Sequence, residues 1–165
     1  MPRYAFVEQY SEEDCGAACV ATVARQYGRN LSLARVRELV GTGSLGSTLL
    51  GLRRGADAIG FQARAVRAES DLLRHLDTVP LPAICHWKGN HWVVLHVKRR
   101  QSYLIADPAV GLRWLSEREF LEGWSNGVML LLEPDLHRLS QQEEAQRAPF
   151  LRFLRLVLPY RGLLV

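Results

Sequence analysis

The sequence predicts an α+β fold in which the helices come first and the strands follow. Helical periodicity, capping residues and glycine stops fill the first sixty residues, whereas short apolar runs separated by turns fill residues 83–133. This segregation is typical of α+β domains, because a wound α/β sheet alternates helices with strands. With 165 residues, 48% apolar and 23% charged, the chain is long enough for one domain with a buried core.

The first predicted helix begins inside a cysteine-containing stretch. Ser11 and Asp14 have the spacing of a capping box, and the alanine-rich run at 16–27 behind them is typical of a buried helix. Cys15 is then expected in the first helical turn. There the unpaired backbone N–H groups and the positive end of the helix dipole favour a thiolate, the reactive form of cysteine.

Two further helices have start and stop signals of their own. Ser32 precedes a helix that ends at Gly41, and Ser47 or Thr48 precedes another that ends at Gly60. Apolar residues recur at helical spacing in both segments. The first sixty residues are therefore predicted to form three helices.

After Gly60 the pattern changes to short runs that suit strands. Pro80 and Pro82 fix an extended entry to one apolar run, and Lys88-Gly89-Asn90 forms a turn after it. Runs joined by such short turns predict a meander of antiparallel strands. The expected elements are strands at 61–67, 83–87, 91–98, 103–107, 112–115 and 127–133, with short helices at 70–76 and from Ser116.

A change in composition places the end of the domain near residue 134. Residues 1–134 are predicted to form the folded domain, and 135–149 a polar linker. Residues 150–165 are apolar with interspersed arginines, and they are fewer than the roughly 20 apolar residues needed to cross a bilayer. We expect them to lie on a membrane surface, the alternative being a helix that packs back on the domain.

The cysteines Cys15, Cys19 and Cys85 are expected to be free thiols. Their number is odd, and the chain opens without an apolar signal segment, so a secreted disulfide framework is not predicted. Cys15 and Cys19 are one helical turn apart, which leaves their β-carbons farther apart than a disulfide tolerates. Cys19 and Cys85 are interpreted as small buried hydrophobes, an interpretation that suits Cys15 less well.

The net charge of +4 restricts the function only slightly. The excess is almost entirely arginine, since Lys88 and Lys98 are the only lysines, and no basic run alternates with aromatic residues. Nucleic-acid binding is therefore not expected. A mildly basic face is equally suited to an acidic peptide.

One set of side chains could support nucleophilic catalysis by Cys15. A cysteine nucleophile needs a base, a group that orients the base, and donors for the oxyanion. His91 opens one predicted strand and Asp107 ends the next, so pairing through the turn near Gln101 brings them together. Gln9 carries an amide that could donate to an oxyanion, although an ordinary surface glutamine is an equal interpretation of its position.

A glycine motif suggests nucleotide binding only weakly. Gly41, Gly43 and Gly46 have dinucleotide-binding spacing, but they follow a helical stretch and not a strand. The pattern G-x-x-x-x-G-K-[ST] is absent, so the chain itself is not expected to bind ATP through such a loop.

A zinc site is a further alternative. Cys85, His86, His91 and His96 are suitable ligand types. Cys85 and His86 face opposite sides of one predicted strand, and so do His91 and His96. We therefore expect no metal centre.

Two tryptophans flank His91 in sequence. Trp87 and Trp92 are candidates for the walls of a substrate channel, and the alternative is that they only fill core volume.

Three blocks contain the candidate residues in the order Gln, Cys, His, Asp. They read Q-Y-S-E-E-D-C-G-A-A-C from Gln9, P-A-I-C-H-W-K-G-N-H-W-V-V-L from Pro82 and Y-L-I-A-D-P-A-V-G from Tyr103. Together they resemble the bacteriocin-processing cysteine peptidases, which are the N-terminal domains of peptidase-containing ABC transporters. The resemblance extends over about Tyr4 to Pro134.

The resemblance implies a papain-like fold and a peptidase activity. The resemblance also implies that Cys15 is the nucleophile, His91 the base, Asp107 the residue that orients the base, and Gln9 an oxyanion donor. Such peptidases remove the leader peptide after a Gly-Gly or Gly-Ala motif from bacteriocin or lantipeptide-like precursors during export. The resemblance implies no cofactor for this step.

Partners and location follow from the same resemblance. Family members continue into a transmembrane domain and a nucleotide-binding domain, and 150–165 resembles the start of that join. ATP is then expected only in the missing nucleotide-binding domain. The implied partners are the precursor peptide and the rest of the transporter, at the cytoplasmic face of the bacterial inner membrane, with the isolated fragment soluble. The residues that bind the leader remain unassigned.

Two other functions stay open at this point. One is a leader-binding module of an exporter that does not cut its cargo, and the intact set of Cys15, His91 and Asp107 argues against it. The other is a different papain-like acyl-transfer enzyme, such as a transglutaminase-like acyltransferase or an amidase. It needs the same three residues, so the product, a hydrolysed peptide or an isopeptide, separates the two.

Overall fold

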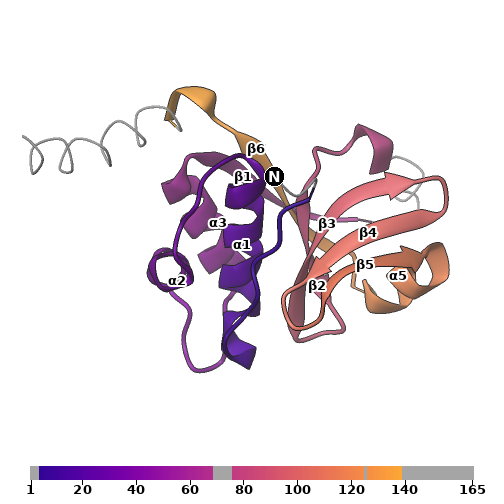
Figure 1. Cartoon of the computed structure of the whole chain (residues 1–165), viewed down its shortest axis with the longest axis horizontal. Helices are drawn as coiled ribbons and strands as arrows, with labels where there is room; N and C mark the ends of the chain where they lie inside the picture. Colours follow the sequence, from indigo (N-terminus) through magenta and orange to yellow (C-terminus); the bar gives the residue numbers. More distant parts are fainter. Residues whose placement is uncertain (1–3, 69–75, 125, 139–165) are drawn as a thin grey trace, which may run out of the picture.

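The computed structural model describes residues 4–68, 76–124 and 126–138. Its first three helices gather in one half and most of its strands, with the last helix, in the other, as predicted for an α+β fold (Figure 1). The helices are α1 (Cys15–Gln26), α2 (Leu33–Val40), α3 (Leu49–Ile59) and α5 (Glu117–Gly123), with 3-10 helices η1 (Glu12–Asp14) and η2 (Leu76–Thr78). The strands are β1 (Phe61–Arg67), β2 (Ala83–Trp87), β3 (His91–Arg99), β4 (Ser102–Asp107), β5 (Gly111–Ser116) and β6 (Val128–Pro134).

Local signals in the sequence set the ends of α2 and α3. The side chains of Ser32 and Thr48 each accept a hydrogen bond from the backbone N–H three residues further on, at 3.3 and 3.1 Å. The helices stop at Gly41 and Gly60, whose φ angles of 70° and 108° are left-handed. The predicted boundaries are confirmed, with Thr48 and not Ser47 as the N-cap of α3.

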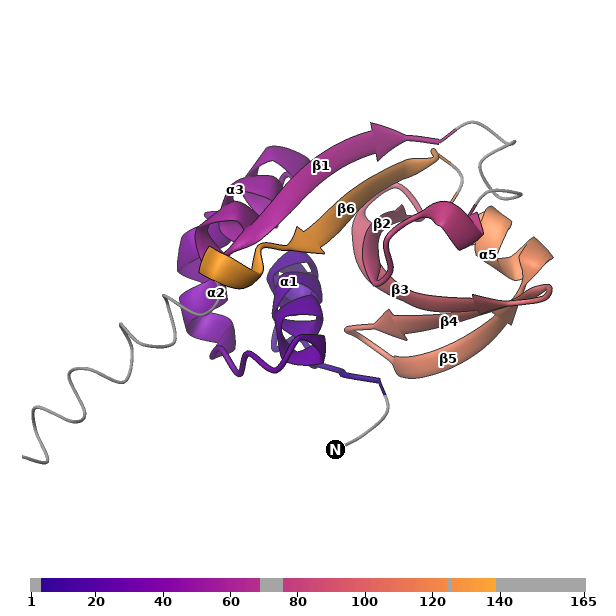
Figure 2. The same cartoon turned by 90° about the horizontal axis from the view of Figure 1, so that it is seen from above.

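The six strands form one antiparallel sheet in the order β1-β6-β2-β3-β4-β5. Strands β2 to β5 follow one another as hairpins, which confirms the predicted meander. Strand β6 returns to pair with both β1 and β2, and Figure 2 shows β1 and β6 side by side. The helix predicted at 70–76 lies outside the described residues, except for Leu76 at the start of η2.

Apolar side chains form a separate cluster on each face of the sheet. Helix α1 covers one face and is buried from Cys15 to Ala24, which explains its run of small and apolar residues. Helix α5 covers the other face, where Phe120 stacks on Tyr103 with ring centroids 4.5 Å apart. The strands are therefore fixed between the helical half and α5.

Most of the predicted linker and terminal segment lies outside the described residues. Of 135–149 the structure describes only 135–138, and it does not describe 150–165. Among the residues that it does describe, no helix has the length and apolar character to cross a membrane.

Candidate active site

The N-terminus of α1 presents Cys15 at the edge of the helical half. Helix η1 leads directly into α1, and its last residue, Asp14, accepts a hydrogen bond from the backbone N–H of Ser11 at 3.2 Å. The guanidinium of Arg37 in α2 lies 2.9 Å from the other oxygen of this fully buried carboxylate. Cys15 is the first residue of α1, as predicted, at the positive end of the helix dipole.

A close approach behind Cys15 forms one wall of the site. A β-carbon on Gly16 would lie 2.7 Å from Cβ of Ser47 and 2.8 Å from Cδ2 of Leu52, so the α2–α3 loop packs directly on this turn. The indole Nε1 of Trp92 donates to the carbonyl of Ser47 at 3.1 Å. This bond joins the helical half to β3 beside the site.

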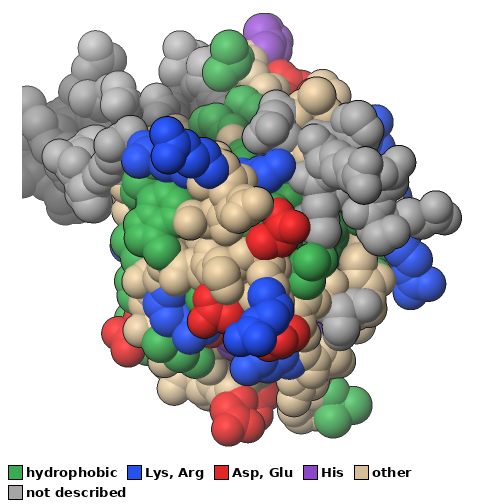
Figure 3. Space-filling view, turned by 90° about the vertical axis from the view of Figure 1, so that its right-hand side faces the viewer, with side chains coloured by type: hydrophobic (Ala, Val, Ile, Leu, Met, Phe, Trp, Pro, Cys, Tyr) green, Lys and Arg blue, Asp and Glu red, His purple; other side chains and the backbone are tan. Residues whose placement is uncertain are grey.

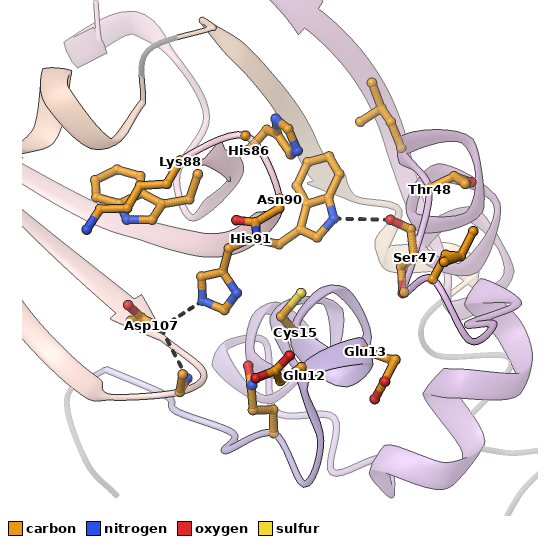
Figure 4. Close-up of a pocket in the computed structure, with 18 of the residues that line it drawn as sticks. Glu12, Glu13, Cys15, Ser47, Thr48, His86, Lys88, Asn90, His91 and Asp107 are labelled. Atoms are coloured by element: carbon orange, nitrogen blue, oxygen red, sulfur yellow. Dashed lines mark hydrogen bonds and ion pairs between the residues drawn. The ribbon is translucent and has the colours of Figure 1, made fainter.

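The strand half supplies an imidazole and a carboxylate. His91 begins β3 and Asp107 ends β4, and His91 Nε2 lies 2.9 Å from Asp107 Oδ1. Because a carboxylate only accepts, Nε2 carries the proton of this bond and Nδ1 is left for Cys15. Figure 4 shows His91 between Asp107 and Cys15. The predicted proximity of His91 and Asp107 is confirmed.

Opposing effects set the pKa of His91. Burial favours the neutral ring and lowers the pKa, whereas hydrogen bonds and electrostatic attraction to Asp107 and Cys15 raise it, with a net value of about 9. The imidazolium is therefore the dominant form of His91 at neutral pH.

Asp107 stays ionised in the same surroundings. Burial raises the pKa of its carboxyl group, but hydrogen bonds from His91 and the Ala109 N–H, together with the charge of Arg113, hold the net pKa below its ordinary value. An ionised Asp107 can both orient His91 and stabilise its charge.

Gln9 lies beside the turn that follows Asp107. Its backbone N–H donates to the carbonyl of Pro108 at 3.1 Å, and its side chain lines the same cavity as Cys15. The side-chain Oε1 is buried without a hydrogen-bond partner among the described residues. The amide of Gln9 is therefore placed at the site, as an oxyanion donor would be.

All four predicted catalytic residues line one open cavity of about 1110 Å³. Trp87 and Trp92, the candidate channel residues, also reach its wall. Further walls come from η1, the α2–α3 loop, the β2–β3 turn, the β4–β5 turn and the start of β6. The cavity thus lies where the helical half meets the strand half.

The model of the Peptidase C39 family matches residues 3–137, most of the chain. The chain belongs to the Peptidase C39 family. This family resemblance was predicted from the three blocks around Cys15, His91 and Asp107, and it is confirmed.

Curated relatives of this C39 chain are much longer proteins. Colicin V secretion/processing ATP-binding protein CvaB of Escherichia coli is 36% identical over 132 residues, 80% of this chain and 18% of that protein. Transport/processing ATP-binding protein ComA of Streptococcus pneumoniae is 34% identical over 162 residues, 94% of this chain and 22% of that protein. The chain spans about a fifth of the length of the curated relatives that it matches.

Solved structures similar to this C39 chain are peptidase domains. The peptidase domain of Streptococcus ComA, a bi-functional ABC transporter, is 33% identical with a TM-score of 0.73, over 79% of this chain and 98% of that one. A double glycine motif protease from an AMS/PCAT transporter, solved with a leader peptide, is 30% identical with a TM-score of 0.73, over 79% and 91%. The papain-like fold is confirmed, and the chain is a cysteine peptidase domain.

The other two cysteines of the C39 domain are packing residues. Cys19 and Cys85 are both 0% exposed, and burial raises the pKa of each thiol above its usual value. This confirms their interpretation as small buried hydrophobes. Cys19 lies one turn behind Cys15 on α1.

The histidines considered as zinc ligands have separate partners. His96 bonds to the carbonyl of Ala5 at 2.8 Å. His86 bonds through Nδ1 to the side-chain amide of Asn126, and its ring lies 4.6 Å from that of Trp92. His91, as described, pairs with Asp107.

Arg113 on β5 is a site residue that sequence reasoning missed. Its guanidinium lies 3.2 Å from Asp107 Oδ2, and it lines the same cavity. The signal was the register of the β4–β5 hairpin, in which Asp107 pairs with Gly111 and Arg113 follows two residues later. Without a known register, nothing in the sequence places this arginine next to Asp107.

Charged side chains are mixed on the face shown in Figure 3. Lys and Arg side chains lie among Asp and Glu side chains there, without separation by sign. Nucleic acid is typically bound by a continuous basic surface, which this face does not present.

Proposed function

We propose that this C39 domain removes leader peptides after a Gly-Gly or Gly-Ala motif from bacteriocin or lantipeptide-like precursors. The observation that carries the proposal is the shared cavity of Cys15, His91 and Asp107, with His91 Nε2 2.9 Å from Asp107 Oδ1. The double glycine motif protease of similar structure was solved with a leader peptide, which supports this substrate class. The relatives named for secretion and processing support cleavage coupled to export.

The first step is attack by Cys15. Its thiolate adds to the carbonyl carbon of the last leader residue, and the oxyanion that forms accepts from the Cys15 backbone N–H and the Gln9 amide. His91, protonated at the start, gives its proton to the leaving amine as the C–N bond breaks. The leader is then a thioester of Cys15, and the remainder of the precursor departs.

Water completes the reaction. Neutral His91 takes a proton from water, which attacks the thioester and releases the leader as a carboxylate while Cys15 regains its thiolate. Asp107 keeps the imidazole ring oriented in both steps. This sequence needs no cofactor.

The rest of the assembly is also part of the proposal. We place the domain, residues 1–134, at the cytoplasmic face of the bacterial membrane, joined through 135–149 and 150–165 to a transmembrane domain. The relatives' names include ATP binding, which supports a nucleotide-binding domain elsewhere in such a protein. The precursor would then meet the peptidase before export.

Mass spectrometry of a precursor after incubation with the domain tests this function. We expect two fragments, cut after the second glycine, from a precursor whose leader ends in Gly-Gly. A matched precursor with valine at that position should stay intact, and Cys15→Ala should leave both intact. One intact species with the native enzyme would instead indicate a leader-binding module, and an isopeptide mass would indicate acyl transfer.

A further inference from the structure

We propose that Arg113 is a positioning residue that holds Asp107, and through it His91, in the reactive geometry. Asp107 is held at both oxygens. Its Oδ1 accepts from His91 Nε2 at 2.9 Å and from the Ala109 backbone N–H at 3.1 Å, and its Oδ2 accepts from Arg113 Nη2 at 3.2 Å. A carboxylate fixed at both oxygens cannot rotate away from His91. This inference rests on the proposed role of Asp107.

The β4–β5 hairpin gives Arg113 this position. Arg113 pairs with Ile105 and Gly111 pairs with Asp107, so the guanidinium reaches back along the hairpin toward the end of β4. The side chain of Asp107 is 7% exposed, whereas that of Arg113 is 41% exposed. A half-exposed ion pair adds little to stability, so we assign its effect to orientation and charge.

The other charged groups around Arg113 and Asp107 are already engaged. Glu119 of α5 also feels the charge of Arg113, but its carboxylate accepts from the Ser116 backbone N–H at 2.8 Å and hydroxyl at 2.6 Å. On the side of β3, Asp107 faces His91, which lies between Asp107 and Cys15 of α1. Among the described residues of β5, Arg113 is the one that forms an ion pair with Asp107.

A second role for Arg113 must be separated from the first. The side chain lines the cavity, so it could bind a carboxylate of the substrate directly. A substrate contact raises KM and is independent of Asp107, whereas positioning lowers kcat and requires Asp107. Loss of the positive charge of Arg113 also raises the pKa of the Asp107 carboxyl group. The acid limb of the pH–rate profile, where activity is lost as the pH falls, therefore moves to higher pH.

The test compares Arg113→Met and Arg113→Lys in the native and Asp107→Asn backgrounds. We expect Arg113→Met to lower kcat by about tenfold at unchanged KM and to move the acid limb up by about half a pH unit. Arg113→Lys keeps the positive charge but lacks the planar guanidinium group. Its acid limb should therefore lie at the native pH, and its kcat should lie between those of Arg113→Met and the native enzyme. In Asp107→Asn, Arg113→Met should cost nothing further.

A control and a second readout keep the outcomes distinct. Arg118→Met, which removes an exposed arginine 3.8 Å from Glu122, should leave kcat and the pH profile unchanged. The rate at which iodoacetamide alkylates Cys15, followed against pH, reports the same acid limb without any peptide. If no precursor is cut but this limb still shifts in Arg113→Met, the proposed function fails and the role of Arg113 stands.

Three results would overturn the role of Arg113. They are an unshifted alkylation profile in Arg113→Met, a change confined to KM, and an equal loss in the Asp107→Asn background. If Arg113→Met does not fold, Arg113→Gln against Arg113→Lys gives the same contrast of charge.

Discussion

Cys15 and Cys19 lie on successive turns of α1 and have different neighbours. Cys15 opens the helix, is 3% exposed, lines the cavity and raises the pKa of His91. Cys19, four residues later, is 0% exposed, and burial raises the pKa of its thiol well above the usual value. Reactivity in this helix therefore depends on the helix end and on partners from the strand half, and not on residue type.

Alanine at each cysteine gives the largest contrast between the two turns. Cys15→Ala should lower the rate of precursor cleavage by on the order of 10⁴-fold or more, because no other group can form the thioester. Cys19→Ala should keep the native rate and lose about 1 kcal/mol of unfolding free energy. Cleavage assays and urea unfolding check this pair, and native-rate cleavage by Cys15→Ala would refute the assignment.

Asp107→Asn removes the carboxylate that orients His91 beside Cys15 and raises the pKa of its imidazole. We expect kcat to fall by roughly 10²- to 10⁴-fold, because the imidazole loses its orientation and its compensating charge. In the native enzyme, kcat/KM should fall as the pH rises through about 9, where His91 loses its proton. In Asp107→Asn this alkaline limb should lie at lower pH, and an unmoved limb would show that Asp107 does not raise the pKa of His91.

The raised pKa of His91 also makes the stability of the fold depend on pH. The pKa of His91 is raised from 6.5 to about 9, so its protonation stabilises the folded state fully below pH 6.5 and this contribution is lost as the pH passes 9. Urea unfolding of the native domain should therefore show a decline above neutral pH that is smaller in His91→Asn. Identical declines in both proteins would contradict the assignment.

Gln9→Ala tests the oxyanion side of the first turn. We expect kcat to fall about 10²-fold with little change in KM, because the donor acts on charge that appears only in the transition state. Gln101→Ala, at the exposed β3–β4 turn, is the matched control and should be silent. If the two variants have equal kcat, Gln9 is an ordinary surface residue.

Gly16→Ala tests the packing of the first turn through stability. The new β-carbon would meet Ser47 and Leu52 within 2.8 Å, so we expect a loss of about 1–3 kcal/mol in unfolding free energy. Gly43→Ala has no atom within 4 Å of the added carbon and should change stability by less than about 0.5 kcal/mol. Equal unfolding midpoints for Gly16→Ala and Gly43→Ala would show that the α2–α3 loop moves aside for the added β-carbon without loss of stability.

Local chemistry explains how much of this site could be predicted from the sequence. The capping pattern of Ser11 and Asp14 placed Cys15 at a helix start, and a single hairpin brought His91 to Asp107. Each of these inferences spans few residues. A bulge between Leu95 and Val97 shifts the register of the β3–β4 hairpin by one residue, but His91 and Asp107 still meet at its open end.

Long-range packing explains what could not be predicted. Pairing of β6 with β1 joins the two ends of the strand region, and no local signal specifies it. The ion pair of Arg37 with buried Asp14 and the bond of Trp92 to Ser47 likewise depend on how separate elements pack. Arg113 became visible as a site residue only when the β4–β5 register was known.

A covalent probe of the precursor class tests the central claim most directly. A leader peptide that ends in Gly-Gly chloromethyl ketone should form one adduct with the native domain, and peptide mapping should place that adduct on Cys15. The Cys15→Ala variant should form none. Cys19 and Cys85, which are 0% exposed and do not line the cavity, should stay unmodified. An adduct on Cys85, or one that persists in Cys15→Ala, would contradict the account.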